Sequence, residues 1–158
     1  ARTLKQPWSV SYHPLMSYQF YIDQEHHCAV IRFIGKINHD EIKAQATELI
    51  ASTKYTKDLN FLRDLTQATL VIGDGLASVK KLVSTRSFQL DDEIGRNRKS
   101  AWVLGNAQDF KKIHQFCALS RISHSIIARQ PFRDVGRAMK WLGFSENYEC
   151  SYKYSSED

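Results

Sequence analysis

Short apolar runs alternate with segments of helical periodicity along most of this chain, and this alternation constrains the fold more than any other feature. Strands that alternate with helices pair in parallel and are joined by right-handed crossovers. The first two strand-like segments have only a short polar turn between them, so we expect an antiparallel hairpin. The predicted order β-β-α-β-α-β-α-β-α describes one α/β domain with a mixed, mostly parallel sheet of five strands and four helices.

The strand pattern is clearest near the start of the chain. Residues 18–23 alternate apolar and polar side chains, which is typical of a strand with one buried face. Residues 28–37 are denser in apolar and β-branched side chains, which indicates a central strand covered on both faces. The other strands are predicted in three shorter runs, at 59–65, 101–104 and 125–128. Pro131 is expected to break the chain after the last of them.

Helical periodicity appears in four segments, and three of them follow a residue that can cap a helix. Asn38 precedes a Glu at the spacing of a capping box. Asn106 and Asp134 are the predicted caps of the last two helices, and Gly143 is expected to end the final one. The remaining helix is expected over 76–83.

Length and composition fit a single globular domain. The chain has 158 residues, of which 42% are hydrophobic and 25% charged. We divide it into an irregular arm (1–17), the domain proper (18–143) and a flexible polar tail (144–158). No apolar stretch approaches the roughly 20 residues that cross a bilayer, and residues 1–10 lack the apolar core of a signal peptide. A cytoplasmic protein is therefore expected.

Cysteines and charge narrow the functional classes. The three cysteines are an odd number and widely spaced, which favours a reducing compartment over a disulfide framework. A net charge of +5 leaves room for an anionic partner. The basic residues are nevertheless spread along the chain, which argues against nucleic-acid binding. The tightest cluster, Arg96, Arg98 and Lys99, is interpreted as a solvated loop.

Three local stretches carry a family resemblance. They are Ile31 to Ile37 (IRFIGKI), Phe61 to Thr66 (FLRDLT), and Pro131 to Asp134 with Ala138 to Leu142 (PFRD…AMKWL). Together with the predicted element order, they resemble the STAS-like superfamily, the fold of anti-sigma-factor antagonists, and especially its bacterial branch called stage II sporulation AA-like. The resemblance covers residues 18–143 and implies a regulatory protein-binding domain.

The same resemblance marks a candidate interaction loop. Phosphorylated antagonists of that family carry the switch Ser at the start of the second helix. Gly73 stands at that position here, and because it has no hydroxyl the phosphorylation switch is not expected. The loop 67–75 remains the expected contact surface, although Asp74 can equally stabilise the dipole of its own helix. The candidate interaction residues are Asp64, Thr66, Gln67, Gly73, Asp74 and Gly75.

The sequence contains no motif that indicates catalysis. It has no nucleophile elbow, no P-loop and no dinucleotide-binding glycine turn. His26, His27 and Cys28 are consecutive, and His114 lies one helical turn before Cys117, so these side chains imitate a zinc set or a Cys-His pair. Neighbouring strand residues point to opposite faces, however, and both cysteines have apolar surroundings. We therefore expect no enzyme activity, no cofactor and no metal.

Two functional interpretations follow. The first is a non-catalytic regulatory or protein-interaction module with an unidentified protein partner. The second is a carrier of a small hydrophobic ligand or lipid, because the resembled branch is also described beside a lipid-transfer type of fold. The 8 Phe, 7 Tyr and 3 Trp of the chain are enough to line an apolar pocket.

We predict that the purified protein carries no stoichiometric zinc, because its His and Cys side chains are not placed to converge on one ion. Elemental analysis of protein prepared without chelator tests this. A content of about one zinc per chain would contradict the interpretation, since a structural zinc site survives purification.

Overall fold

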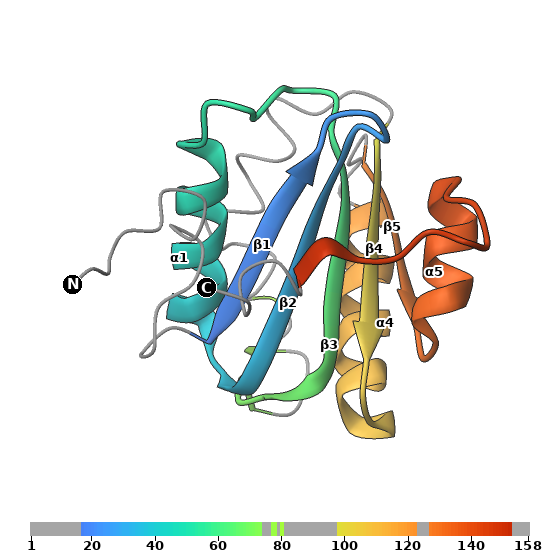
Figure 1. Ribbon diagram of the computed structural model, residues 1–158. Helices are drawn as coiled ribbons and strands as arrows, with labels where there is room; N and C mark the ends of the chain where they lie inside the picture. The colour runs from blue at the N-terminus through green and yellow to red at the C-terminus, as the bar shows by residue number, and fades with distance from the viewer. Residues whose placement is uncertain (1–16, 74–76, 79, 81–97, 123–126, 153–158) are drawn as a thin grey trace.

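A mixed five-stranded sheet forms the centre of the structure, a computed structural model that describes residues 17–73, 77–78, 80, 98–122 and 127–152 (Figure 1). The elements are β1 (Tyr18–Asp23), β2 (Cys28–Ile37), α1 (His39–Ile50), β3 (Asn60–Leu70), β4 (Lys99–Leu104), α4 (Ala107–Ile122), β5 (Ala128–Phe132) and α5 (Val135–Leu142). The strands lie in the sheet in the order β1-β2-β3-β4-β5, which is also their order along the chain.

Strand pairing agrees with the predicted α/β class. β1 pairs with β2 antiparallel, and the other three pairs are parallel. The described residues contain three of these helices, one fewer than the four expected. Of the helix expected over 76–83, only residues 77, 78 and 80 are described, and these are helical. No helix in the described part of the chain combines the length and the apolar character that a membrane crossing requires.

The predicted helix caps are confirmed. The Asn38 side chain accepts a hydrogen bond from the Glu41 backbone N–H at 3.0 Å, and the Glu41 carboxylate accepts one from the Asn38 N–H at 3.0 Å. Asn106 accepts from the Asp109 N–H at 2.8 Å at the start of α4. Asp134 caps α5, and Gly143 ends that helix in the left-handed conformation. Each cap depends on residues only a few positions apart, so it can be predicted from the sequence alone.

Three strands differ from their predicted bounds. β4 begins at Lys99, two residues before the predicted run 101–104. β3 continues to Leu70, five residues beyond the predicted end. The prediction ended too early because the last part of β3 alternates buried and exposed residues and does not form an apolar run. β5 is Ala128–Phe132, where 125–128 was predicted, and it contains Pro131. A proline is tolerated there because β5 is an edge strand, and an edge strand needs backbone donors on one side only.

The inner face of the sheet packs against α1 and α4. Ile42 and Leu49 of α1 and Ile113 and Phe116 of α4 belong to the larger of two buried clusters. Trp102 of β4 is fully buried there, with its ring 5.9 Å from that of Phe116 in an edge-to-face arrangement. This cluster is the main hydrophobic core.

The outer face is covered by α5 and by the segment 144–152, which we call the strap. In Figure 1 the strap leaves α5 and passes in front of β4 and β3 to reach β2. Phe144 and Tyr152 are each 7% exposed in a cluster with Val30 and Leu62 of the sheet. The expected flexible tail is therefore wrong for residues 144–152, because single aromatic residues anchor a segment that is otherwise polar; residues 153–158 lie outside the described residues.

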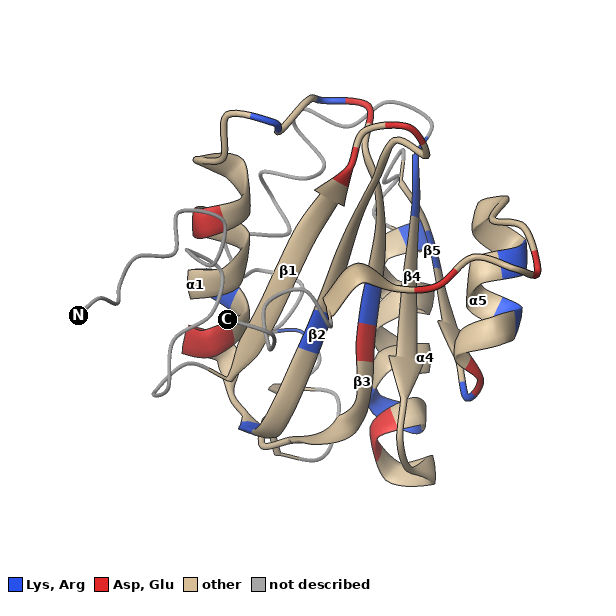
Figure 2. Ribbon diagram, viewed as in Figure 1, with Lys and Arg blue, Asp and Glu red and all other residues tan. Residues whose placement is uncertain are grey.

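The predicted solvated basic loop is also corrected. Arg98 is only 1% exposed, and its guanidinium carbon lies 4.8 Å from the centroid of the Phe61 ring. It donates to the Leu59 carbonyl at 3.2 Å and to the Tyr55 hydroxyl at 3.4 Å. Lys99 is exposed at the start of β4, and Arg96 lies outside the described residues. In Figure 2 the described Lys and Arg positions are spread over several elements.

Trp102 and Trp141 lie on different faces of the sheet, and we expect their replacement by Ala to lower the free energy of unfolding by different amounts. Trp102→Ala should destabilise the protein by about 3 to 5 kcal/mol, because this ring is fully buried. Trp141 of α5 is half-buried, with its ring 5.6 Å from Phe132, so Trp141→Ala should cost less but still lower the melting temperature. Thermal unfolding followed by circular dichroism measures both. A Trp141→Ala shift within about 2 °C would reject a packing role, since 1 kcal/mol moves a domain of this size by roughly 2 to 4 °C.

Candidate functional site

The structure divides the predicted interaction residues between a strand and the chain that follows it. Thr66 and Gln67 belong to β3, so the expected loop 67–75 is wrong in its first part. Gly73 lies beyond the end of β3. The remaining two candidates, Asp74 and Gly75, lie outside the described residues.

Asp64 stabilises an irregularity in the pairing of β2 with β3. The register runs from Arg32↔Asp64 to Ile34↔Gln67, so β3 advances one residue more than β2. The Asp64 carboxylate accepts hydrogen bonds from the Thr66 N–H at 2.9 Å and from its hydroxyl at 2.7 Å. This local Asx arrangement satisfies the backbone where the ladder is displaced. The bulge turns Gln67 and the odd-numbered residues after it toward the outer face.

Gly73 adopts a backbone conformation that disfavours a side chain. Its φ of +76° lies in the left-handed region, which a residue with a Cβ seldom adopts. A Cβ added here would come within 2.8 Å of the Ser78 hydroxyl oxygen, which would have to rotate away. The position that the resemblance assigns to a phosphorylated Ser therefore lacks the hydroxyl and has a backbone conformation in which a Ser would be strained.

The second halves of β2 and β3 present an exposed surface. Phe33 and Ile37 belong to the inner core, as do Ala68 and Leu70, so strand alternation directs the residues between them outward. The register places Ile34 beside Gln67 and Lys36 beside Thr69. We call this surface the β2–β3 face, and it consists of Ile34, Lys36, Gln67, Thr69 and Val71.

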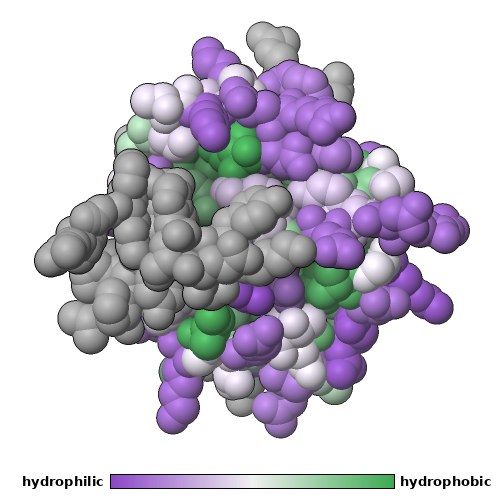
Figure 3. Space-filling view, viewed as in Figure 1, coloured by the Kyte–Doolittle hydropathy of each residue, from purple (hydrophilic) through white to green (hydrophobic). Residues whose placement is uncertain are grey.

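Two large apolar side chains stand on the β2–β3 face. Ile34 is 41% exposed and Val71 is 53% exposed. α5 packs on β3, β4 and β5 and is not the cover of this part of the sheet. On the outer side of the molecule, hydrophobic residues appear in patches separated by hydrophilic ones (Figure 3). The sequence analysis missed Ile34, Lys36 and Val71, because their exposure depends on where the covering elements lie.

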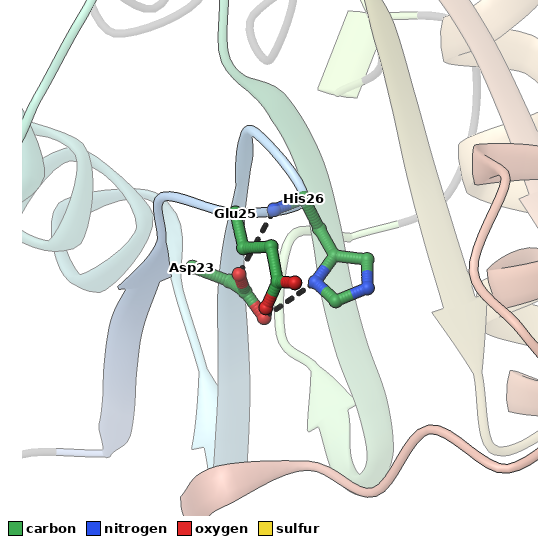
Figure 4. A group of neighbouring side chains, drawn as sticks. All are labelled: Asp23, Glu25 and His26. Atoms are coloured by element: carbon green, nitrogen blue, oxygen red, sulfur yellow. Dashed lines mark hydrogen bonds and ion pairs between the residues drawn. The ribbon is translucent and has the colours of Figure 1, made fainter.

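A second polar group lies at the turn between β1 and β2, beside the strap. Asp23 accepts hydrogen bonds from the His26 backbone N–H and from the His26 ring Nδ1, each at 2.9 Å (Figure 4). It also accepts a hydrogen bond from the Tyr148 hydroxyl at 2.8 Å. The Tyr148 and Tyr21 hydroxyl oxygens lie 2.8 Å apart. The His26 ring stacks on Phe144, with 4.8 Å between the ring centroids. The strap is thereby tied to the first hairpin.

This group also contains donor atoms of the types that bind metals. Ligand atoms of Asp23, Glu25 and His26 all lie within 4.8 Å of one another. Two carboxylates and an imidazole suit a transition metal or zinc. The three hydrogen bonds to Asp23 nevertheless account for this geometry as the closure of a turn. Cys28 and Cys117 belong to clusters on opposite faces of the sheet, so the zinc set imitated by the sequence is not assembled.

The pKa values follow from burial and these contacts. Burial alone would raise the pKa of Asp23, but the hydrogen bonds from His26 and Tyr148 hold it below its usual value. Burial, reinforced by Tyr21 and Asp23, raises the pKa of Tyr148, which therefore remains a donor at neutral pH. Burial raises the pKa of the Cys28 thiol, and that of Cys117 to about 12. A nucleophilic cysteine requires the opposite shift.

No family model matches the chain, and no curated protein matches it.

We predict that Asp23→Asn lowers stability at pH 7 by about 1 to 3 kcal/mol, because a carboxylate that accepts three hydrogen bonds is lost. The pKa of Asp23 is depressed in the folded state, so its stabilisation is present above its unfolded value of about 4 and disappears as the pH falls through the folded pKa. Urea unfolding at pH 7 and pH 3 should show the difference between wild type and Asp23→Asn shrinking at the lower pH. The exposed neighbour Glu25 provides the control, and Glu25→Gln should change stability little at either pH.

Proposed function

We propose that this chain is a non-catalytic protein-interaction module of STAS-like type, and that an amphipathic helix of a protein partner binds its β2–β3 face. The observation that carries the proposal is the exposure of Ile34 on β2 and of Val71, the residue directly after the end of β3. β2 and β3 are adjacent and parallel. Parallel strands are normally covered on both faces. The half-covered outer face therefore favours completion by another molecule.

A helix is the cover that this surface favours. α5 already packs on the β3–β5 part of the outer face, and a second helix beside it would complete the layer. Lys36 stands between the two apolar residues, so a carboxylate on the polar side of the partner helix would complement it. Gln67 and Thr69 offer hydrogen bonds at the rim, as interface rims usually do.

The sheet order further supports a binding module. In open α/β sheets, small ligands bind in a crevice where the strand order reverses direction. The order β1-β2-β3-β4-β5 contains no such reversal. The carrier alternative has less support, because aromatic side chains that would line a pocket pack against one another, as Trp102 does with Phe116 and Tyr18 with Phe33.

We predict that the double variant Ile34→Glu/Val71→Glu binds the partner of the wild-type protein with a dissociation constant at least about tenfold higher, because two carboxylates replace the apolar contacts. The partner is captured from extracts of the protein's own cells, identified, purified and titrated directly. Circular dichroism should show an unchanged fold, since both residues are exposed.

The matched control is Ile122→Glu. Ile122 is 72% exposed at the end of α4, which packs on the opposite side of the sheet. It should bind the partner as wild type does. Equal loss of binding in the control and the double variant, or full binding by the double variant, would remove the β2–β3 face as the docking surface. A retained lipid or small molecule in native mass spectrometry, with no protein partner, would favour the carrier instead.

A further inference from the structure

The strap is attached to the sheet by contacts of its aromatic side chains. The Tyr148 hydroxyl binds Asp23 and Tyr21, each at 2.8 Å. The Tyr152 ring lies under the Arg32 guanidinium, with 4.3 Å from the guanidinium carbon to the ring centroid. The backbone hydrogen bonds of the strap at Phe144 and Tyr148 are local, to the Met139 and Ser145 carbonyls. The Ser151 backbone and the Cys150 side chain also hydrogen-bond the Tyr21 side chain, so none of these contacts belongs to the strand ladder. A segment held in this way can open without breaking the strand ladder.

Apolar parts of β2 and β3 lie beneath the strap. Cys28 and Val30 of β2 and Leu62 of β3 are at most 1% exposed and share a cluster with Phe144 and Tyr152. Cys150 of the strap packs against this same cluster. These covered residues point to the same side of the sheet as Ile34 and Lys36. The covered surface and the β2–β3 face are therefore two halves of one strip.

Arg32 marks the boundary between these halves. It donates to Gln19 at 2.6 Å on the neighbouring strand and supports the Tyr152 ring. From Gln67 to Val71 the open half runs about 13 Å, at about 3.3 Å per residue. From Cys28 to Lys36 the complete strip runs about 26 Å, enough for a partner helix of about 17 residues at 1.5 Å per residue. Stable interfaces usually bury about 800 Å² per partner, so the complete strip fits a partner better than the open half.

We infer that the strap is a displaceable cover that opens independently of the rest of the fold and restricts the partner helix to half of its binding strip. This regulation rests on the proposed function of the β2–β3 face. Displacement of Tyr152 from Arg32 joins the two halves, and Cys28 and Val30 then contact the partner. The strap acts as an autoinhibitory contact, and its release strengthens binding.

The two buried cysteines test strap opening without any partner. Cys28 lies under the strap, whereas Cys117 is a residue of α4 that is 0% exposed in the core on the inner face. Labelling with N-ethylmaleimide, followed by mass spectrometry of each cysteine peptide, compares wild type with Tyr148→Phe. The substitution removes the hydroxyl that binds Asp23, and it should accelerate labelling of Cys28 by about tenfold with Cys117 unchanged. If both thiols are labelled faster by the same factor, or if neither is labelled faster, the strap does not open independently of the rest of the fold.

Tyr18→Phe is the matched control. Tyr18 lies on β1 at the inner face, and its hydroxyl donates to the Glu48 carboxylate at 2.7 Å, so the same chemical change is made away from the strap. It should leave Cys28 labelling at the wild-type rate, and an equal acceleration would remove the specific role of Tyr148. A partner identified by capture should bind Tyr148→Phe more tightly than wild type, and unchanged binding would refute autoinhibition. Labelling of Cys28 tests strap opening without any partner, whereas the binding of Ile34→Glu/Val71→Glu tests the β2–β3 face. The two proposals can therefore fail separately.

Discussion

The right-handed crossover between parallel strands is the constraint on which the rest of this structure depends. Because each parallel strand is added on the same side of its predecessor, right-handed crossovers direct their helices to one face of the sheet. α1 and α4, which connect described strands, both pack on the inner face. The outer face receives no crossover helix from them. Its cover has to come from the end of the chain, as α5 and the strap, and the β2–β3 face is what these two leave open.

Signals that act within a few residues were predictable from the sequence. The caps at Asn38, Asn106 and Asp134 need only their neighbours in the chain, and the bounds of β1 and β2 follow from uninterrupted patterns. The end of β3 was missed because Gln67 and Thr69 are exposed, which the sequence pattern of a buried strand does not anticipate. The predicted range of β5 ended before Pro131, because a proline is acceptable in a strand only where the strand is known to lie at an edge of the sheet.

The resemblance pointed to Asp64 and Gln67 as interaction residues, and that role stays a prediction. The structure gives Asp64 a role that the resemblance did not suggest, in the bulge that displaces Gln67. The contact between Asp23 and Tyr148 joins residues 125 positions apart, and no periodicity reports such a pair. The strap escaped notice because aromatic residues four apart in a polar segment indicate neither a strand nor a buried helix on their own.

The agreement between the spatial and the chain order of the strands also bears on how the protein folds. Each strand pairs with the one that precedes it in the chain, so every step of sheet growth closes the shortest loop that this set of elements permits. Low sequence separation between contacting segments favours rapid folding. The order also allows growth in one direction during synthesis, from the β1–β2 hairpin toward β5, with each new strand meeting a finished edge. The strap follows β5 and α5 in the chain and contacts the first hairpin, so it can pack only on strands that precede it.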